Sequence, residues 1–192
     1  MMHSLEYIVE KEFANIDYSK SKFVIAEYEN CRFIKCNFSN SKLIEAIFIN
    51  CEFENCEFSN CNISSTVFRD VNFSKCNLSG LEFNSCNQLL ISFSFNECKI
   101  NLASFFGMKL HKTEFIKCIF REVDFGRTDL TASSFDDCDL SQTIFDNSTL
   151  SKCDFRKAIN YSIDPEQNRI SKAKFSVAGL PGLLNKYDIV IE

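Results

Sequence analysis

Eleven cysteines are the residues of this sequence best able to do chemistry, because a thiolate binds metal ions and two thiols form a disulfide. Three of them stand five residues apart in CEFENCEFSNCNI, residues 51–63. Zinc ligands typically occur as Cys-x-x-Cys pairs that converge on one point, and the sequence contains no such pair. An odd number of cysteines fits a reducing compartment better than a disulfide scaffold. We therefore predict reduced thiols and no metal site.

Catalytic residues in a recognisable arrangement are equally scarce. The only histidines are His3 and His111, the serines and threonines have no nearby base, and the five glycines are scattered rather than gathered in a phosphate-binding loop. His111 directly follows an apolar position of the repeat described below, so we expect it to be a solvated surface residue. The sequence predicts a protein that is not an enzyme and needs no cofactor.

Composition and charge narrow the class of protein further. Hydrophobic residues make up 45% of the 192 residues, which is enough for a substantial core. A formal net charge of −5 argues against nucleic acid or an anionic membrane as a direct partner. The first residues, MMHSLEYIVEKEF, contain no apolar run of signal-peptide length, and no stretch is long enough to cross a membrane. We expect a soluble, cytoplasmic protein.

An apolar residue recurs at every fifth position along most of the chain. One series of these centres runs from Phe13 to Phe83 and a second from Leu90 to Phe155, and every centre is Phe, Leu, Ile or Tyr. Five residues advance a helix face by about 140°, and five is odd, so neither a helix nor a flat strand would bury all the centres. All of them can point inward only if the chain turns a corner once per repeat. The pattern predicts a solenoid.

Residues twenty apart match each other, which predicts four sides per coil and about seven coils. The phenylalanines of one predicted stack are Phe13, Phe33, Phe53, Phe73, Phe95, Phe115, Phe135 and Phe155. The matching cysteines are Cys36, Cys56, Cys76, Cys98, Cys118 and Cys138. Both ladders contain one step of 22 residues, so we expect a two-residue insertion near 84–90.

The cysteines have a structural interpretation in this coil. Ten of the eleven lie two places before a centre, and Cys86, at the insertion, is the exception. The other residues at this second inward position are mostly small, such as Ala46 and Ser133. A narrow coil has room there only for a small side chain, and free cysteine behaves as a small hydrophobe. We predict that the cysteines are core residues.

The repeat resembles the pentapeptide-repeat family, on motifs such as CNF, CNL, TDL, CDL and CDF between Phe13 and Phe155. This resemblance implies an all-β, right-handed quadrilateral β-helix. The expected division is an N-terminal lead-in at 1–12, the β-helix at 13–157 and a C-terminal cap and dimerisation segment at 158–192.

The tail from 158 to 192 resembles the topoisomerase-poison resistance branch of that family, which includes quinolone-resistance proteins and albicidin- and microcin-immunity proteins. This resemblance implies a DNA-mimicking, rod-shaped homodimer that binds DNA gyrase or topoisomerase IV and protects it from topoisomerase poisons. The alternative is a generic rigid interaction module with no topoisomerase role. VAGLPGLLNKY at 177–187 predicts a short helix and DIVIE at 188–192 a closing strand. The expected dimer-interface residues are Leu180, Leu183, Leu184, Tyr187, Ile189 and Ile191.

The stretch 122–154 is the most acidic part of the chain and is the expected partner-binding surface. Aspartates directly before a centre are typical of the repeat and are expected to bond the backbone at a corner; they are Asp124, Asp129, Asp139 and Asp154. The candidates for partner contact are Glu122, Asp136, Asp137, Asp139 and Asp146. Phe106 and Leu89 are candidates for an exposed apolar contact.

Overall fold

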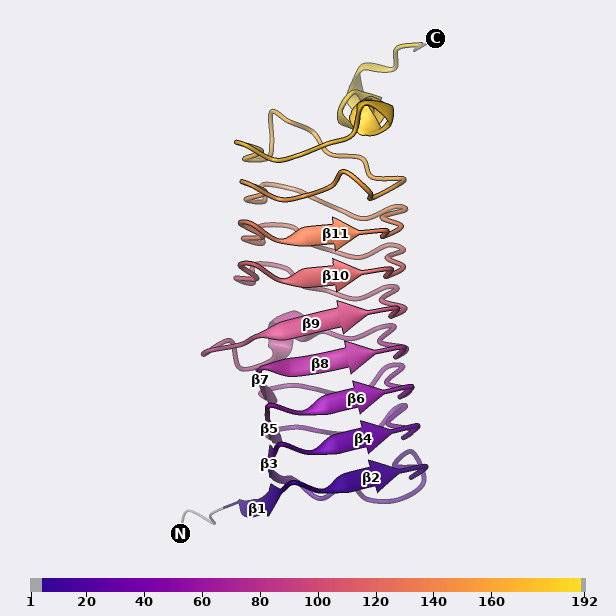
Figure 1. Cartoon of the computed structure of the whole chain (residues 1–192), viewed down its shortest axis with the longest axis vertical. Helices are drawn as coiled ribbons and strands as arrows, with labels where there is room; N and C mark the ends of the chain where they lie inside the picture. Colours follow the sequence, from indigo (N-terminus) through magenta and orange to yellow (C-terminus); the bar gives the residue numbers. More distant parts are fainter. Residues whose placement is uncertain (1–4, 191–192) are drawn as a thin grey trace.

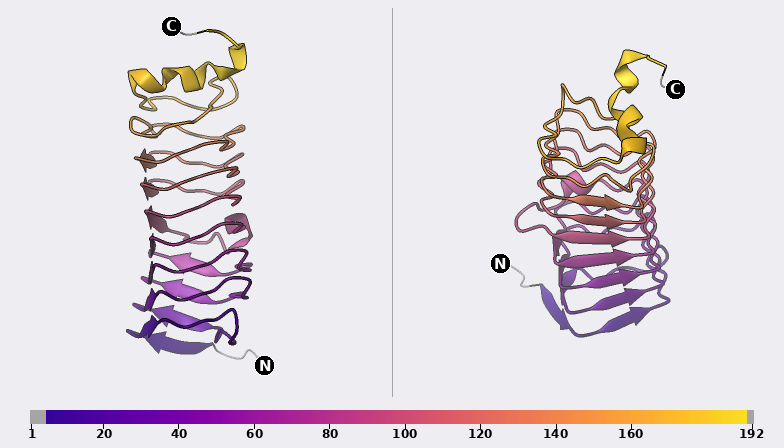
Figure 2. Two further views of the ribbon diagram at one scale, coloured as in Figure 1. Left: turned by 90° about the vertical axis from the view of Figure 1, so that its right-hand side faces the viewer. Right: turned by 45° about the horizontal axis from the view of Figure 1, so that its top comes forward.

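The structure is a computed structural model that describes residues 5–190, and it is a rod built from one continuous coil (Figures 1 and 2). The first residue of this range lies at one end of the rod and the last at the other. Two parallel sheets run along the rod. One contains β1 (Glu6–Val9), β3 (Ala26–Glu29), β5 (Ile47–Ile49) and β7 (Val67–Arg69). The other contains β2 (Glu12–Ala14), β4 (Arg32–Ile34), β6 (Glu52–Glu54), β8 (Val71–Ser74), β9 (Phe93–Asn96), β10 (Glu114–Ile116) and β11 (Ser134–Asp136).

Each coil has four sides, as the twenty-residue recurrence predicts. We call the side that carries the seven-stranded sheet, β2-β4-β6-β8-β9-β10-β11, side one. The side that carries the four-stranded sheet, β1-β3-β5-β7, is side four. Sides two and three lie between them along the chain, and isolated parallel bridges connect their levels, for example Asn37 to Glu57 on side two and Lys42 to Asn62 on side three. The strands of side one run from left to right in Figure 1 while the chain climbs, which is the sense of a right-handed coil.

The centres of side one form one continuous stack of rings inside the coil. Phe33 and Phe53 are paired across neighbouring strands, with ring centroids 4.8 Å apart. Phe73 pairs with Phe95 across the 22-residue step, and their rings are 5.5 Å apart and nearly parallel at 9°. Phe115 is fully buried, like most of the stack. The predicted phenylalanine stack is therefore continuous across the 22-residue step, which confirms the two-residue insertion.

All eleven cysteines are unpaired and buried. In nine of them, the thiol donates a hydrogen bond to the carbonyl of a centre or of a neighbouring residue on the level below, as Cys56 does to Phe33 at 3.3 Å. Cys86 makes the same contact with Ile63 at 3.4 Å, so it too is an inward residue. The prediction that Cys86 belongs to the insertion is wrong, because the extra residues come after it.

The corners are made by left-handed backbone. At nearly every corner the residue two places after a centre has a φ between about 50° and 70°, as in Asn55 (54°) and Asn60 (54°). Asparagine is common there because its short side chain tolerates this conformation better than most. Bulkier residues also occupy corners, as Lys117 does with a φ of 52°. One left-handed residue per repeat turns the chain; Gly80 and Gly107 occupy two of these corners, and most of the others are not glycine.

The two-residue insertion lies within 88–91 rather than anywhere from 84 on. Asn87 still bridges to Val67, twenty residues earlier, whereas the N–H of Asp70 bonds Ser92, twenty-two residues later. Leu90 was expected to be an inward centre and is instead 65% exposed, because the insertion places it in the protruding loop. Phe93 takes its place in the core and packs against Phe68 with ring centroids 5.5 Å apart.

The coil extends beyond both expected boundaries. β1 pairs with β3, so the first coil begins at Glu6 and not at 13. At the other end the ring of Phe175 stacks on Phe155 at 5.4 Å, so the coil continues past 157. A short helix, η1 (Phe83–Ser85), precedes the insertion.

The expected helix at 177–187 is present as two 3-10 segments, η2 (Val177–Leu183) and η3 (Asn185–Tyr187). The expected strand at 188–192 is not: residues 188–190 form no strand, and Ile191 lies outside the described residues.

Candidate functional site

The five acidic residues proposed as a partner surface do not share one side of the rod. Asp136 follows Phe135 on side one, and Asp146 follows Phe145 on side three. The rings of Phe135 and Phe145 meet inside the coil, 6.2 Å apart and perpendicular. The two carboxylates therefore leave the rod from opposite sides, although they are only ten residues apart in sequence.

Asp137 and Asp139 lie around the corner between sides one and two. Asp137 is exposed at the left-handed corner position, with a φ of 54°. Asp139 accepts hydrogen bonds from the backbone N–H of Ser141 at 3.1 Å and from the side chain of Asn160 at 2.8 Å. Partial burial opposes ionisation, but these hydrogen bonds hold the pKa of Asp139 below its usual value. Its carboxylate fastens the corner, as expected for an aspartate before a centre.

Basic residues neutralise part of the acidic stretch. Lys157, one level above, forms an ion pair of 2.9 Å with Asp136, whose side chain is 42% exposed. The hydrogen bond to Asp136 raises the pKa of Lys157. Glu122, Asp137 and Asp146 are exposed, and none has an ion pair within residues 5–190. These three carry the free acidic charge of the candidate surface.

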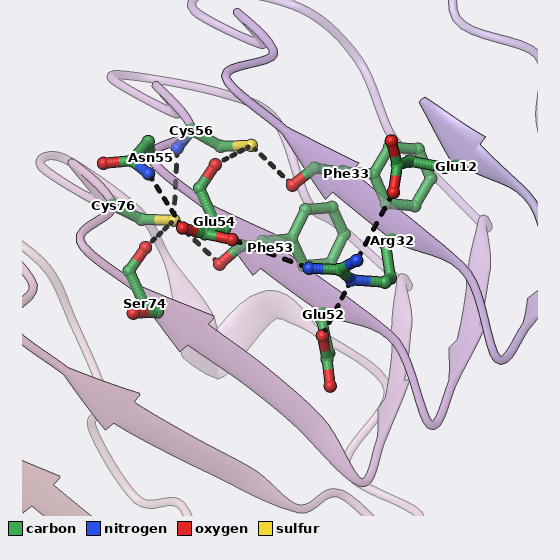
Figure 3. Close-up of polar contacts among 10 residues, drawn as sticks. All are labelled: Glu12, Arg32, Phe33, Glu52, Phe53, Glu54, Asn55, Cys56, Ser74 and Cys76. Carbon is green, nitrogen blue, oxygen red and sulfur yellow. Dashed lines mark hydrogen bonds and ion pairs between the residues drawn. The ribbon is translucent and has the colours of Figure 1, made fainter. Parts of the chain in front are cut away.

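Near the N-terminus, side one carries a charge network in which one guanidinium contacts three carboxylates (Figure 3). The guanidinium of Arg32 contacts Glu12 at 3.3 Å on the level below, and Glu52 at 3.1 Å and Glu54 at 3.7 Å on the level above. All four side chains are about half exposed, so each pair contributes little to stability. The three carboxylates exceed the one guanidinium, so this part of side one keeps a net charge of −2.

Phe106 is an exposed apolar residue whose ring packs on the neighbouring level of the coil. It is 42% exposed on side three and lies over Gly126 of the next level, where a Cβ would be 3.2 Å from its ring. The guanidinium of Arg127 lies 5.6 Å from the ring centroid. In the insertion loop, Leu89 is 71% exposed. Phe106 is thus held in position, while Leu89 is presented to solvent.

The C-terminal cap is fastened to the last levels of the coil. Ser176 caps η2 by accepting a hydrogen bond from the N–H of Gly179 at 3.1 Å. Tyr161 lies beneath η2, and a Cβ on Gly179 or Gly182 would come within 2.0 and 2.4 Å of Tyr161 atoms. Lys186 also reaches Asp164 at 2.7 Å. The two glycines of GLPG are therefore required by the close approach of Tyr161.

The cap leaves most of the proposed dimer residues exposed. Leu180, Tyr187 and Ile189 are 45%, 50% and 56% exposed. Leu183 is different, because it packs against the core and is only partly exposed. It lies at the contact between the cap and the coil, and its role in a dimer stays a prediction. Leu184 is half-buried.

The described residues contain little that is typical of an enzyme. No group of three or more His, Cys, Asp or Glu side chains within 5–190 is placed to hold a metal ion. His111 is a surface residue, as expected: its side chain is 52% exposed, and its Nε2 lies 2.8 Å from Asp129. A groove of about 560 Å³ between η2 and the last levels contains Tyr161 and Lys157. In the same part of the chain, no helix is long and apolar enough to span a bilayer.

Two family models match the chain. A model of the pentapeptide repeat region matches residues 26–105, and a model of eight copies of the pentapeptide repeat matches 124–159. No curated protein matches the sequence significantly.

Among solved structures, a trypsin-treated variant of QnrB1, a plasmid-mediated fluoroquinolone resistance protein, aligns over 99% of both chains with a TM-score of 0.55 and 17% identity. A second trypsin-treated QnrB1 variant aligns over 98% of this chain and 99% of its own, with a TM-score of 0.52 and 18% identity. TM-scores above 0.5 show a shared fold, and at identities of 17% and 18% the likeness shows the fold alone. Together the two repeat models cover more than half of the sequence, and the chain belongs to the pentapeptide-repeat family.

Proposed function

We propose that this protein binds DNA gyrase or topoisomerase IV and protects it from a topoisomerase poison. The observation that carries the proposal is the end-to-end correspondence with the fluoroquinolone resistance protein QnrB1, which includes the rod and the C-terminal cap over 99% of both chains. A repeat rod alone would favour only a generic interaction module. The cap, with its exposed apolar residues, distinguishes this chain from a bare solenoid.

We propose that two chains join through their caps, end to end. Stacked coils leave unpaired edges at the ends of a rod, and such edges need a cap or a partner. Val177 and Leu180 on η2 are 86% and 45% exposed, and Ile189 and Val190 beyond η3 are 56% and 87% exposed. A two-fold contact would bury these side chains against their own copies.

Shape supports the proposal more strongly than charge does. Nine stacked levels, separated by eight steps of about 4.8 Å, give a rod about 38 Å long, and two chains end to end double that length. Duplex DNA carries about one charge per 1.7 Å, or about 20 over the length of one chain. The net charge of the chain is only −5. The resemblance to DNA is therefore local, and Asp137, Asp146 and Glu122 are the residues that supply it.

Because these carboxylates lie on different sides, single substitutions identify the side that faces the enzyme. We expect Asp137→Lys to weaken gyrase binding if the corner of sides one and two makes the contact, and Asp146→Lys if side three does. Glu97→Lys is the matched control, since Glu97 occupies the same exposed corner position two levels below Asp137, with a φ of 54°.

The test is a gyrase supercoiling and cleavage-complex assay with and without the protein, in the presence of a quinolone. We expect fewer drug-stabilised cleavage complexes, with less protection at high salt because exposed charges are screened. If the purified protein neither binds gyrase nor changes drug-stabilised cleavage at micromolar concentration, the generic interaction module is the correct reading.

A further inference from the structure

Side four is divided into nine levels, and the insertion occupies the middle one. The levels are residues 6–10, 26–30, 46–50, 66–70, 86–92, 108–112, 128–132, 148–152 and 168–172. Four levels lie below the insertion loop and four above it. In Figure 1 this loop projects from the rod between β8 and β9, about halfway along the rod.

The four lower levels of side four are acidic. Their charged side chains are five carboxylates and one guanidinium, a net charge of −4: Glu6, Glu10, Glu27, Glu29, Asp70 and Arg69. The carboxylates of the two lowest levels are the most numerous, because each of these levels has two and no basic residue.

The four upper levels have the opposite charge. Their charged side chains are five cations and one carboxylate, a net charge of +4 with His111 neutral: Lys109, Lys112, Lys152, Arg169, Lys172 and Asp129. All five cationic residues are exposed. The highest level, with Arg169 and Lys172, carries two positive charges, so the extremes of side four are opposite in sign and equal in size.

These charges have few partners within the chain. Asp129 pairs with His111, Glu29 accepts a hydrogen bond from Tyr7, and Asp70 accepts one from Ser92 at 2.8 Å. None of the five cations forms an ion pair with another residue of the described chain, 5–190. Both halves of side four therefore present free charge to solvent.

We propose that side four is a self-complementary docking surface that takes a second copy of this chain in antiparallel orientation. A two-fold axis through the insertion level would place each level of one copy against the level at the same distance on the other side of the loop. Glu6 and Glu10 would then face Arg169 and Lys172 of the second copy, and Glu27 and Glu29 would face its Lys152.

The apolar contact of this pairing is at its centre. Leu89 and Leu90 are 71% and 65% exposed in the insertion loop, and the two-fold axis brings them beside the same residues of the second copy. An apolar centre with a charged periphery is the usual arrangement of a specific interface. The charges set the antiparallel orientation, because a parallel pairing would place like charges together.

Charge complementarity favours a second copy over a polyanion such as nucleic acid. A polyanion would be attracted by the upper half of side four and repelled by the lower half, whereas a second copy matches both. This lateral pairing does not depend on the proposed gyrase function, and it uses a different surface from the cap.

The experiment measures the mass of the full chain by sedimentation in low and high salt. We expect a lateral species at low salt that is lost at 1 M, where the Debye length falls to about 3 Å. Variant A, Lys152→Glu with Arg169→Glu and Lys172→Glu, changes the net charge of the upper half from +4 to −2 and should lose this species. Variant B, Glu10→Lys with Glu27→Lys and Glu29→Lys, makes the lower half basic and should also lose it.

Mixing variants A and B should restore the lateral species, because their side-four charges are again complementary. The control variant carries Lys42→Glu, Lys99→Glu and Arg121→Glu on sides two and three. It has the same net charge as variant A and an unchanged side four, so it should associate like the wild type. Circular dichroism of each variant confirms that the coil is folded. A salt-sensitive species of variant A alone, beyond the end-to-end dimer formed through the caps, or failure of the mixture to form the lateral species, would overturn the proposal.

Carbodiimide cross-linking tests the orientation directly, since it joins a lysine to a carboxylate in contact. Glu10 and Lys172 lie eight levels apart, about 38 Å at 4.8 Å per level, so they can be joined only between two chains. We expect a cross-linked peptide containing these two residues, and its loss in 1 M salt. Cross-links between Glu10 and lysines of the lower half alone would contradict the antiparallel arrangement.

Discussion

At the residue scale, the contribution of the phenylalanine stack to stability can be measured at Phe115. Its ring is fully buried and lies 5.2 Å from Phe95 and 4.9 Å from Phe135. Truncation leaves a cavity that the rigid coil cannot fill, so we expect Phe115→Ala to lower the free energy of unfolding by about 3–5 kcal/mol. Phe106→Ala, on the surface, should cost less than about 1 kcal/mol. Equal losses in urea titrations of the two variants would contradict the assignment.

The buried thiols predict a pH dependence of stability. Burial raises the pKa of Cys51 to about 12, of Cys61 to about 11 and of Cys153 to about 12, from an ordinary value of 9.0. In the unfolded chain these thiols ionise near pH 9, whereas in the coil they stay protonated. Their contribution is complete below pH 9 and is lost as the pH rises toward 11–12. We expect the urea midpoint to fall between pH 9 and 11; a constant midpoint would show that the thiols are accessible.

At the element scale, the contact between cap and coil depends on two glycines. A Cβ on Gly182 would lie 2.4 Å from the carbonyl oxygen of Tyr161, which is backbone and cannot rotate away. We expect Gly182→Ala to displace η2, expose the cap to limited proteolysis and cost about 1–3 kcal/mol. Gly107→Ala is the control, because its Cβ would meet no atom within 4 Å and only its φ of +70° is unfavourable. A cap equally resistant to protease in both variants would contradict the role of Gly182.

The hydroxyl of Tyr161 gives a prediction of opposite sign. It is buried under η2 and has no hydrogen-bond partner among the described residues. Leaving such a group unsatisfied costs about 1–3 kcal/mol, so removing it should stabilise the protein. We expect Tyr161→Phe to raise the midpoint of thermal unfolding. A lower midpoint would mean that the hydroxyl has a partner, for example in a second chain.

The sequence predicted the coil because nearly every five-residue repeat has an apolar centre, usually with a small residue two places before it. The twenty-residue recurrence of matching residues then sets the register of one level on the next. The same register could have predicted the pair of Asp136 and Lys157, which lie on adjacent levels. It could not predict the position of Tyr161 under η2, because the repeat ends before the cap. Leu90 was misplaced for a related reason: periodicity counts residues, whereas packing selected Phe93, whose ring fills the space beside Phe68.

At the scale of the whole molecule, the C-terminal end of the rod is covered by the cap. Deleting residues from Val177 onward would uncover the last levels and remove the contact between η2 and Tyr161. The polar groups of the last level would then be free to pair with another chain, as at any exposed strand edge. We expect the truncated protein to be monomeric or to aggregate, as measured by light scattering, and to retain the β-rich circular dichroism of the coil.

The matched control is the full chain with Val177→Asp and Leu180→Asp, which keeps the cap but makes its outer surface acidic. This control should stay soluble and lose only the end-to-end dimer. If the truncated chain forms the same dimer as the wild type, the cap does not join the two chains, and the salt-sensitive pairing of side four would be the remaining route to assembly.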